Sequence, residues 1–508
     1  MCRMKKSYPK SDFVDILLFL EGTYPFVSGG VSSWVHNLIN NLKQFNFGII
    51  FLGGSSNDYS EMCYTIPANL KHLEVHYLFD DVYKEVVDHK DIYKANYENM
   101  KTIHEKFTFD NKCPIDIVEL NEILFGSKAF NINDFLYSEA SWDYINDKYS
   151  ANCPNISFLD YFWMVRNMHK PIWKLLNMME AFPKTKISHS VSTGYAGFLG
   201  ALFKIKHKNP FILTEHGIYV KERKIDLLSQ MTTVGNESEL LKIKTQQQVT
   251  EINIKFFEVL SKICYQQADP IISLFKGYSD IQIESGAPIE KSMIIPNGVT
   301  IQSDSVLQKT EPNINNPIIA LIGRVVPIKD IKTFIRSLII IKKQIPNIKA
   351  WIVGPTSEDE EYYEECMQLI NVLEIKESID FLGQQQVDKI YNQIDLTVLS
   401  SISEGLPLVV LESYSSGVPV VATDVGSCSE LIYGSSPEDQ EIGVSGLIVK
   451  IADPNALGNA IVKIIKDKEL WRSAQLAGKE RVKRFYSQGD FIDSYTKIYN
   501  EAIKLWQE

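Results

Sequence analysis

The sequence has few cysteines, no long apolar segment and no excess of positive charge. Its seven cysteines are scattered over 508 residues and include no C-x-x-C pair. This pattern argues against a zinc site and a disulfide framework, and it favours a reducing compartment. No segment reaches the ~20 apolar residues that a transmembrane helix needs. The longest apolar run, residues 191–203, contains several Gly, Ser and Thr residues and predicts a buried helix.

The charge balance excludes several kinds of partner. A formal net charge of −11, from 52 basic and 63 acidic residues, disfavours general attraction to nucleic acid or anionic lipid. An anionic ligand must therefore be held by local groups. The basic start of the chain is not followed by the apolar run of a signal peptide, because Asp12, Asp15 and Glu21 interrupt it. We therefore expect a cytoplasmic protein with no transmembrane segment of its own.

The order of apolar runs predicts an α/β protein. Short apolar runs alternate with helical patterns, which is typical of parallel sheets covered by helices. A chain of this length is too long for one ordinary core, so two domains are expected. The predicted strands are residues 13–20, 48–52, 211–214, 271–274, 294–296, 317–322, 350–354, 378–382, 395–400, 418–423 and 447–449.

The polar stretch 300–316 is the best linker in the sequence. It predicts an N-terminal domain over residues 1–300 and a second domain over 301–469, followed by C-terminal helices over 470–508. Between about residues 58 and 160 the pattern is irregular, aromatic and acidic. We interpret this part as an insertion within the N-terminal domain.

Two carboxylates, Glu404 and Glu412, have seven residues between them around a predicted helix start. Pro407 suits the first helical position, and the backbone N–H groups of a helix start can hold a diphosphate without a metal ion. Six helical residues of about 1.5 Å each place Glu412 roughly 9 Å beyond Leu406, which is comparable with the reach from a sugar phosphate to the ribose. Glu412 would then accept hydrogen bonds from the ribose, while Glu404 faces the transferred sugar. The alternative is an exposed loop glutamate followed by an ordinary helix glutamate.

Two cations follow the predicted strand 317–322. Arg324 comes just after its end, and Lys329 follows five residues later. Because ligands of open α/β sheets bind at the carboxyl ends of the strands, both cations would project toward the helix start described above. Arg324 can donate two hydrogen bonds to phosphate, and Lys329 adds a point charge. The alternative is a pair of surface cations near a turn.

The N-terminal half offers a glycine pair and a histidine. Gly29 and Gly30 follow the first strand and permit close approach of the backbone to a ligand. Their loop lacks the G-x-G-x-x-G pattern, which counts against a nicotinamide cofactor. His216 follows the strand 211–214, where it could hydrogen-bond a sugar hydroxyl. The alternatives are a tight turn and an ordinary loop histidine.

Taken together, these motifs resemble the retaining glycosyltransferases of family 4 in the two-domain GT-B class. Residues 21–36 and 216–225 are similar to the PelF-type glycosyltransferases of Pel exopolysaccharide biosynthesis. The resemblance covers nearly the whole chain, including the segment 58–160. It implies a GT-B fold, in which two Rossmann-like doubly wound domains face a cleft and the last helix crosses back to the first domain.

The resemblance also implies a UDP-sugar donor, UDP-glucose in the first place, and a glycan acceptor. Arg324 and Lys329 would hold the diphosphate, Glu412 the ribose, and His216 would reach the hexose from the first domain. The remaining donor contacts would be Glu404 and the backbone of Gly405, Leu406, Pro407 and Leu408 at the hexose, with Leu382 and Gly383 by the uracil. The donor sugar stays open between glucose and an N-acetylated hexosamine.

The implied chemistry needs neither a metal ion nor a cofactor. No Asp-x-Asp motif stands at a suitable strand end, and no nucleophile is evident, so we expect a same-face displacement assisted by the leaving phosphate. The family further implies inner-membrane partners that export the polymer. Three alternatives stay open: another GT-B transferase such as a glycogen-synthase-like enzyme, a nucleotide-sugar epimerase, and an inactive UDP-binding scaffold.

Overall fold

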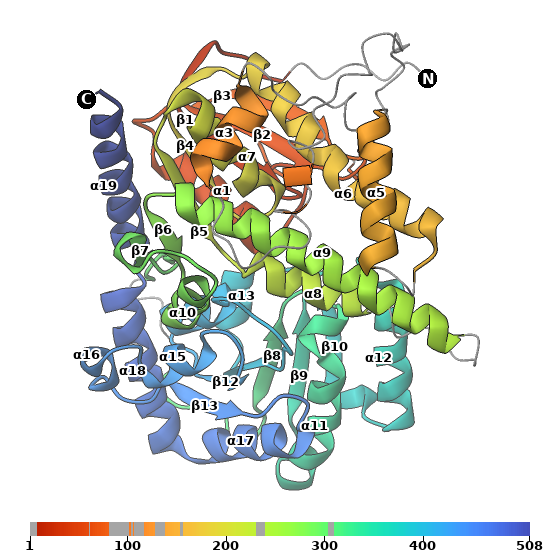
Figure 1. Cartoon of the computed structure of the whole chain (residues 1–508). Coiled ribbons are helices and arrows are strands. Elements are labelled where there is room, and N and C mark those ends of the chain that lie inside the picture. Colours follow the sequence, from red (N-terminus) through yellow and green to blue (C-terminus); the bar gives the residue numbers. More distant parts are fainter. Residues whose placement is uncertain are drawn as a thin grey trace, which may run out of the picture. The chain divides into compact units, whose positions relative to one another are not determined.

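The computed structural model describes residues 8–59, 61–80, 101–102, 105, 116–126, 138–152, 156–229, 239–302 and 309–507. The chain forms two compact units, each built on its own sheet (Figure 1). Unit 1 comprises Met1–Ser273, Tyr278–Met293 and Thr496–Glu508, and unit 2 comprises Leu274–Gly277 and Ile294–Tyr495. The last helix, α19 (Gln488–Gln507), therefore contributes residues to both units.

A seven-stranded sheet forms the centre of unit 1, in the order β3-β2-β1-β4-β5-β6-β7. The pairs from β3 to β6 are parallel. The strands are β1 (Phe13–Glu21), β2 (Phe47–Gly53), β3 (Leu70–Tyr77), β4 (Lys184–Ser190), β5 (Phe211–Glu215), β6 (Ile271–Ser273) and β7 (Ser292–Ile294). The described α-helices in this part of the chain are α1 (Gly30–Asn41), α3 (Ile117–Phe125), α5 (Glu139–Asn152), α6 (Phe158–Met178), α7 (Tyr195–His207), α8 (Tyr219–Ser229), α9 (Glu239–Gln267) and α10 (Lys276–Glu284).

Two strands of this sheet, β3 and β4, are not predicted from the sequence, because their polar side chains hide the strand pattern. In β3, the Nε2 atoms of His72 and His76 contact the Glu74 carboxylate at 2.9 and 3.1 Å. In β4, His189 is fully buried and hydrogen-bonds Tyr499 and Thr214. Strand β3, which pairs with β2 at the edge of the sheet, lies within the predicted insertion 58–160, and much of the remainder of that segment lies outside the described residues.

The buried helix predicted at 191–203 is found as α7, but it begins later, at Tyr195, and continues to His207. Residues Val191–Gly194 instead connect β4 to the helix. The other predicted strands are found within two residues of their bounds, except that β7 ends where the predicted strand 294–296 begins. Part of the predicted linker, residues 303–308, lies outside the described residues.

A six-stranded parallel sheet forms the centre of unit 2, in the order β10-β9-β8-β11-β12-β13. Its strands are β8 (Ile318–Ile322), β9 (Lys349–Val353), β10 (Ile379–Gly383), β11 (Leu396–Leu399), β12 (Val420–Thr423) and β13 (Gly446–Val449). Its described helical segments, besides α19, are the 3₁₀ turns η6 (Pro327–Lys329) and η7 (Lys376–Ser378) and the helices α11 (Ile331–Gln344), α12 (Glu360–Val372), α13 (Val387–Tyr391), α14 (Leu408–Ser415), α15 (Cys428–Tyr433), α16 (Pro437–Gln440), α17 (Pro454–Lys466) and α18 (Lys468–Phe485).

Both faces of this second sheet are buried, as β8 shows. Ile319 and Leu321 belong to one apolar cluster, which includes residues of α11 and α17. Ala320, between them, belongs to another cluster with Ile390 of α13. Because successive side chains of a strand point to opposite faces, helices cover both faces of the sheet.

Each sheet has one point at which its strand order reverses. In the first sheet this switch point lies between β1 and β4, and in the second between β8 and β11. Ligands of open α/β sheets bind outside the carboxyl ends of the strands at such a point. The two switch points are therefore the places at which to look for binding sites.

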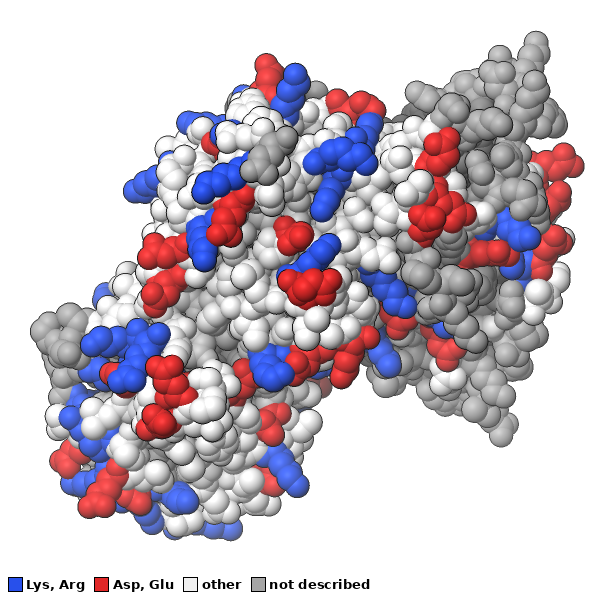
Figure 2. Space-filling view, turned by 60° about the vertical axis from the view of Figure 1, so that its left-hand side comes forward, with Lys and Arg blue, Asp and Glu red and all other residues white. Residues whose placement is uncertain are grey.

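The surface carries charges of both signs. Figure 2 shows Lys and Arg side chains interspersed with Asp and Glu side chains over the described part of the face drawn. In the described residues, no helix combines the length and the apolar character that crossing a membrane requires.

Candidate active site

At the switch point of unit 2, a lysine and a glutamate from the two adjoining strands meet. Lys329, which follows β8, contacts Glu404, which follows β11, with 2.5 Å between Nζ and Oε1. The side chains are 20% and 12% exposed, so the ion pair is largely shielded from water. The Ser401 hydroxyl donates to the same Glu404 oxygen at 2.5 Å. A backbone hydrogen bond from Ile402 N–H to Ile328 O, 2.9 Å, joins the two loops.

The loop that carries Glu404 is also fixed by the loop after β12. Gly426 has φ +54°, and a Cβ on it would lie 2.3 Å from the Gly405 carbonyl oxygen and 2.4 Å from that of Glu404. Ser427 donates its N–H and its hydroxyl to the Gly405 carbonyl, at 3.0 and 3.2 Å. Only glycine fits at position 426, because both its backbone conformation and its contact distance exclude a side chain.

Helix α14 begins beside this loop. The sequence predicted Pro407 as the first helical residue, but it is the N-cap. Its φ of −72° suits a helix, whereas its ψ of 110° is extended. A buried hydrogen bond of 2.7 Å between the Ser413 and Thr397 hydroxyls ties the helix to β11. The first N–H groups of a helix have no carbonyl partner within it and carry a partial positive charge. The α14 start can therefore receive an anion.

Glu412, on the second turn of α14, is partly buried. The Tyr391 hydroxyl lies 3.5 Å from its Oε2 atom and donates to the Val409 carbonyl at 3.1 Å. Tyr391, the last residue of α13, thus lies against both the backbone of α14 and the Glu412 carboxylate.

The other predicted residues of unit 2 lie at the same edge of the sheet, since Arg324 follows β8 and Leu382 and Gly383 end β10. Arg324 contacts Glu358 at 2.9 Å, and with side chains 49% and 38% exposed this pair is well solvated. Gly383 has φ +63° and would have no atom within 4 Å of an added Cβ. The carbonyl of Leu382 accepts a hydrogen bond from the Gln385 side chain at 2.7 Å. The structure thus brings Lys329 to Glu404 and pairs Arg324 with a carboxylate that sequence reasoning did not single out.

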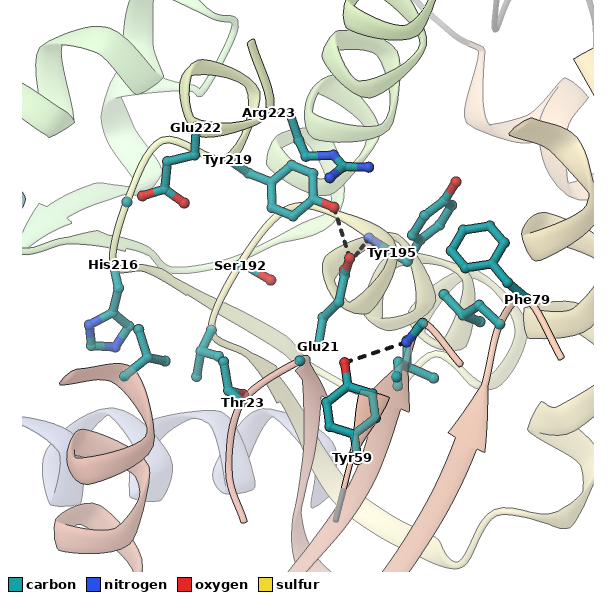
Figure 3. A pocket seen from close by; sticks show the side chains of 18 residues that line it. Glu21, Thr23, Tyr59, Phe79, Ser192, Tyr195, His216, Tyr219, Glu222 and Arg223 are labelled. Atoms are coloured by element: carbon teal, nitrogen blue, oxygen red, sulfur yellow. Dashed lines mark hydrogen bonds between the residues drawn. The ribbon is translucent and has the colours of Figure 1, made fainter. Parts of the chain in front are cut away.

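The switch point of unit 1 holds a cavity of about 580 Å³ (Figure 3). Its walls come from the carboxyl ends of β1, β2, β3, β4 and β5 and from the start of α8. The labelled side chains in Figure 3 that line it are Glu21, Thr23, Tyr59, Phe79, Ser192, Tyr195, His216, Tyr219, Glu222 and Arg223. Its volume lies within the range of about 300–1,000 Å³ that is usual for small-ligand sites.

Glu21 stands at the end of β1 on the wall of this cavity. Its Oε2 atom accepts hydrogen bonds from the N–H groups of Tyr195 and Ala196, at 2.7 and 3.2 Å, which open helix α7. Its Oε1 atom accepts from the Tyr219 hydroxyl at 2.8 Å. Burial raises the pKa of the Glu21 carboxyl, while the bonds from Tyr219, Ala196 and Tyr195 act to lower it. The carboxylate thus fills the positive end of α7.

His216 lies on the same wall, and its ring packs edge to face on Trp34, with 4.5 Å between the ring centres. Burial lowers the pKa of His216 to about 3, so the imidazole is neutral at physiological pH. Its Nε2 atom and the Oγ1 atom of Thr23 are buried and have no hydrogen-bond partner in the described structure. Gly29 and Gly30 do not line the cavity, and an added Cβ on either would meet no atom within 4 Å.

Sequence reasoning missed several of these groups. Glu21 is named in the sequence as a charge that interrupts an apolar run and as the start of the stretch 21–36, but it receives no role, although its place at the end of a buried strand was a usable signal. Thr23 and Tyr219 lie within the two stretches that carry the resemblance without a role of their own, and Tyr59 belongs to no motif. The sequence shows Gly426 only as one of many glycines, and nothing in it predicts that this residue packs against Gly405.

Among the described residues, no group of three or more His, Cys, Asp or Glu side chains could hold a metal ion.

Comparison with family profiles covers both units. Residues 14–290, more than half of the chain, match the family described as "Domain of unknown function (DUF3492)". The chain belongs to that family. In this DUF3492 protein, residues 303–481 also match the family "Glycosyl transferases group 1", and this match includes Arg324, Lys329, Glu404 and Glu412.

Among curated proteins, the capsular polysaccharide biosynthesis glycosyltransferase CapM of Staphylococcus aureus is 28% identical over 194 residues, which are 37% of this chain and 47% of CapM. The DUF3492 protein therefore spans about half the length of that relative. The GT-B fold expected from the sequence is confirmed by solved structures.

Two of the proteins whose solved structures match do so over their full length. The Anabaena protein HepE in complex with UDP aligns with a TM-score of 0.57 and 14% identity, over 96% of this chain and 100% of HepE. Sucrose-phosphate synthase from Thermosynechococcus elongatus aligns with a TM-score of 0.57 and 15% identity, over 97% of this chain and 100% of that enzyme. At these identities the likeness concerns the fold.

Proposed function

We propose that this protein is a retaining glycosyltransferase of the PelF type, in family 4, that transfers a hexose from a UDP-sugar to a glycan acceptor. UDP-glucose is the donor that we place first. The glycosyltransferase group 1 match over residues 303–481 supports the transferase class, and the UDP complex of HepE supports a uridine nucleotide. The Pel-type assignment rests on the resemblance of residues 21–36 and 216–225.

The observation that carries this proposal is the meeting of Lys329 and Glu404 at the switch point of unit 2, beside the start of α14. A cation and a helix start attract a diphosphate, and a carboxylate next to them can accept a hydrogen bond from a sugar hydroxyl. Glu404 already accepts from Lys329 and Ser401. An ionised carboxylate offers about four lone-pair sites, so it keeps acceptor capacity for a sugar.

In the proposed reaction, the bond between the sugar C1 and the phosphate oxygen breaks while the acceptor hydroxyl attacks C1 from the same face. The proton of that hydroxyl passes to the leaving phosphate oxygen, so UDP leaves protonated at that oxygen, and the acceptor oxygen becomes the glycosidic oxygen. Arg324, Lys329 and the α14 start stabilise the charge that develops on UDP. We assign no metal ion or further cofactor to this step.

The remaining ligand contacts follow the same proposal. Glu412 binds the ribose, Gly405 to Leu408 contact the hexose, and Leu382 with Gly383 adjoins the uracil. We assign the acceptor glycan to the cavity of unit 1. His216, which the resemblance assigned to the donor hexose, lies on the wall of this cavity, and we assign it instead to a hydroxyl of the acceptor. We place the protein in the cytoplasm, beside inner-membrane partners that export the polymer.

The test is a calorimetric titration of the purified protein, in the absence of divalent metal, with UDP, UDP-glucose, UDP-N-acetylhexosamines, GDP-mannose and ADP-glucose. Selective binding of the uridine compounds is expected, and the same series ranks the donors. Failure to bind any of them would overturn the donor assignment.

Product analysis separates the rival activities. A transferase forms a glycoside only when acceptor is added, whereas an epimerase isomerises the UDP-sugar without acceptor. A scaffold binds UDP and forms neither product.

A further inference from the structure

The wall of the cavity of unit 1 includes two residues with a buried polar atom for which the described part of the chain offers no hydrogen-bond partner. These atoms are Thr23 Oγ1 and His216 Nε2, both buried. A buried polar atom without a hydrogen bond destabilises the folded protein, so such atoms at a cavity wall point to a ligand that supplies the missing bonds. A hydroxyl can donate to one of these atoms and accept from the other. The ring of Phe79, which is 48% exposed, offers an apolar surface at the same wall.

The cavity also contains a negative group where an α/β fold commonly binds phosphate. Helix α7 starts at the switch point, and a phosphate there would accept from its first N–H groups. In this protein Glu21 accepts from those groups, at Tyr195 and Ala196. The Tyr219 hydroxyl holds the other carboxylate oxygen. A phosphate would therefore have to displace a carboxylate held by three hydrogen bonds, or lie beside it against charge repulsion.

The space around Gly194 shows that Glu21 is built into this position. A Cβ on Gly194 would lie 2.7 Å from Glu21 Oε2 and 2.4 Å from the Tyr219 ring. The glycine that precedes α7 thus leaves the room in which the carboxylate and the tyrosine meet.

We propose that Glu21 is a specificity-determining residue, which reserves the cavity of unit 1 for an uncharged sugar of the acceptor and excludes phosphorylated ligands. This rests on the proposed function, since the acceptor glycan is the occupant. Thr23 and His216 bond to the hydroxyls of the sugar, and Glu21 accepts a further hydroxyl hydrogen with its remaining lone pairs. The unpaired atoms of Thr23 and His216 indicate a ligand with hydroxyl groups, such as a sugar. The Glu21 carboxylate is the reason that phosphorylated ligands are excluded.

The test measures binding of sugars and of their phosphates by saturation-transfer NMR, with UDP at saturating concentration so that the donor site is occupied. The probes are glucose, galactose, N-acetylglucosamine and N-acetylgalactosamine, each with its 6-phosphate. The parent protein is expected to bind at least one of the free sugars and to bind its 6-phosphate at least about tenfold more weakly.

Glu21→Gln keeps the shape of the side chain and removes its charge. We expect it to raise the affinity for the 6-phosphate about tenfold, while the affinity for the free sugar changes less than about threefold. The matched control is Glu222→Gln, which removes another carboxylate from the wall of the same cavity and should give no such gain. Thr23→Val should weaken the free sugar about tenfold without helping the phosphate, and it provides a test that does not depend on changing Glu21.

Three results would overturn the proposal: equal binding of sugar and sugar phosphate by the parent, binding of no free sugar, or an equal phosphate gain in Glu21→Gln and Glu222→Gln. The titration with UDP, made on the same samples, tests the donor site separately. A parent protein that does not bind UDP would contradict the proposed function. A parent protein that binds UDP but does not prefer a free sugar to its 6-phosphate would contradict only the role of Glu21.

Discussion

The two sheets place opposite charges at the same topological position. In unit 1 the strand before the switch point, β1, ends in Glu21, and the helix after the switch point, α7, starts against that carboxylate. In unit 2 the corresponding strand, β8, is followed by Arg324 and Lys329, and the corresponding helix, α14, starts after a proline cap without a side-chain hydrogen bond.

This difference shows how one architecture can serve two kinds of ligand. A helix start attracts an anion wherever it occurs. In unit 1 the protein supplies the anion itself, and in unit 2 it adds cations around the helix start. We therefore expect unit 2 to bind the charged nucleotide and unit 1 to bind the uncharged acceptor sugar.

The largest effect is expected from Lys329→Ala. It removes a cation from the diphosphate site and leaves the shielded Glu404 carboxylate without its ion pair. Loss of one preorganised charge-stabilising group costs about 10²–10³ in turnover. Steady-state kinetics with UDP-glucose measures it. The control is Lys332→Ala, which breaks another 2.5 Å ion pair, with Glu365 on α12, and should leave turnover unchanged. Equal losses in the two variants would show that the switch point has no special role.

Glu412→Ala should weaken donor binding about ten- to a hundredfold, since hydrogen bonds to a charged group contribute about 1.5–3 kcal/mol. Calorimetry with UDP and with uracil nucleotides that lack a ribose hydroxyl measures the change. Tyr391→Phe serves as the control, because it removes the hydroxyl that lies 3.5 Å from Glu412 and keeps the carboxylate. Donor affinity that is unchanged by Glu412→Ala would remove the ribose assignment.

Gly426→Ala tests whether the loop of Glu404 depends on its neighbour. The added Cβ would meet the Glu404 and Gly405 carbonyls, so both donor affinity and stability should fall, by about 1–3 kcal/mol. Thermal unfolding and UDP titration measure the two effects. Gly443→Ala is the matched control, since Gly443 also has a positive φ, +100°, but an added Cβ there meets no atom within 4 Å. Equal loss of UDP affinity in both variants would contradict a steric role.

The smallest effect concerns pH and only unit 1, because all nine histidines precede residue 217. Burial lowers the pKa of His169 to about 4 and that of His189 to about 3. The unfolded chain takes up these protons below about pH 6.5, so their contribution to stability is complete above that pH and is lost as the pH falls toward 3. At pH 5.5 each histidine should cost about 1 kcal/mol.

Hydrogen exchange at pH 7 and pH 5.5, compared for peptides of the two units, checks this prediction. The raised pKa values of Glu21 and Glu215 increase the stability of unit 1 as the pH falls, which opposes the effect of the histidines. The decisive comparison is therefore between the parent and a histidine variant. His189→Gln should flatten the pH dependence of unit 1 by about one proton. An unchanged slope would show that His189 is protonated in the folded state.

Much of the fold was predictable because its strands are apolar and separated by helical patterns. The strands that escaped prediction, β3 and β4, carry polar groups that the structure satisfies: His72 and Glu74 contact each other within β3, and His189 bonds to the distant Tyr499. The pattern of apolar residues in the sequence cannot reveal a strand that carries such polar side chains. The start of α14 was misplaced by one residue because proline fixes φ and leaves ψ to the surrounding loop.

The sequence by itself determined the α/β class, since this depends on local pattern. It also singled out the carboxylates Glu404 and Glu412 and the cations Arg324 and Lys329 by their spacing, and their roles stay predictions. Only the tertiary structure decided which groups meet. Lys329 and Glu404 are 75 residues apart, and Glu21 and Tyr219 are 198 apart. Such contacts depend on the order of strands in the sheet, which brings the ends of distant strands to one switch point.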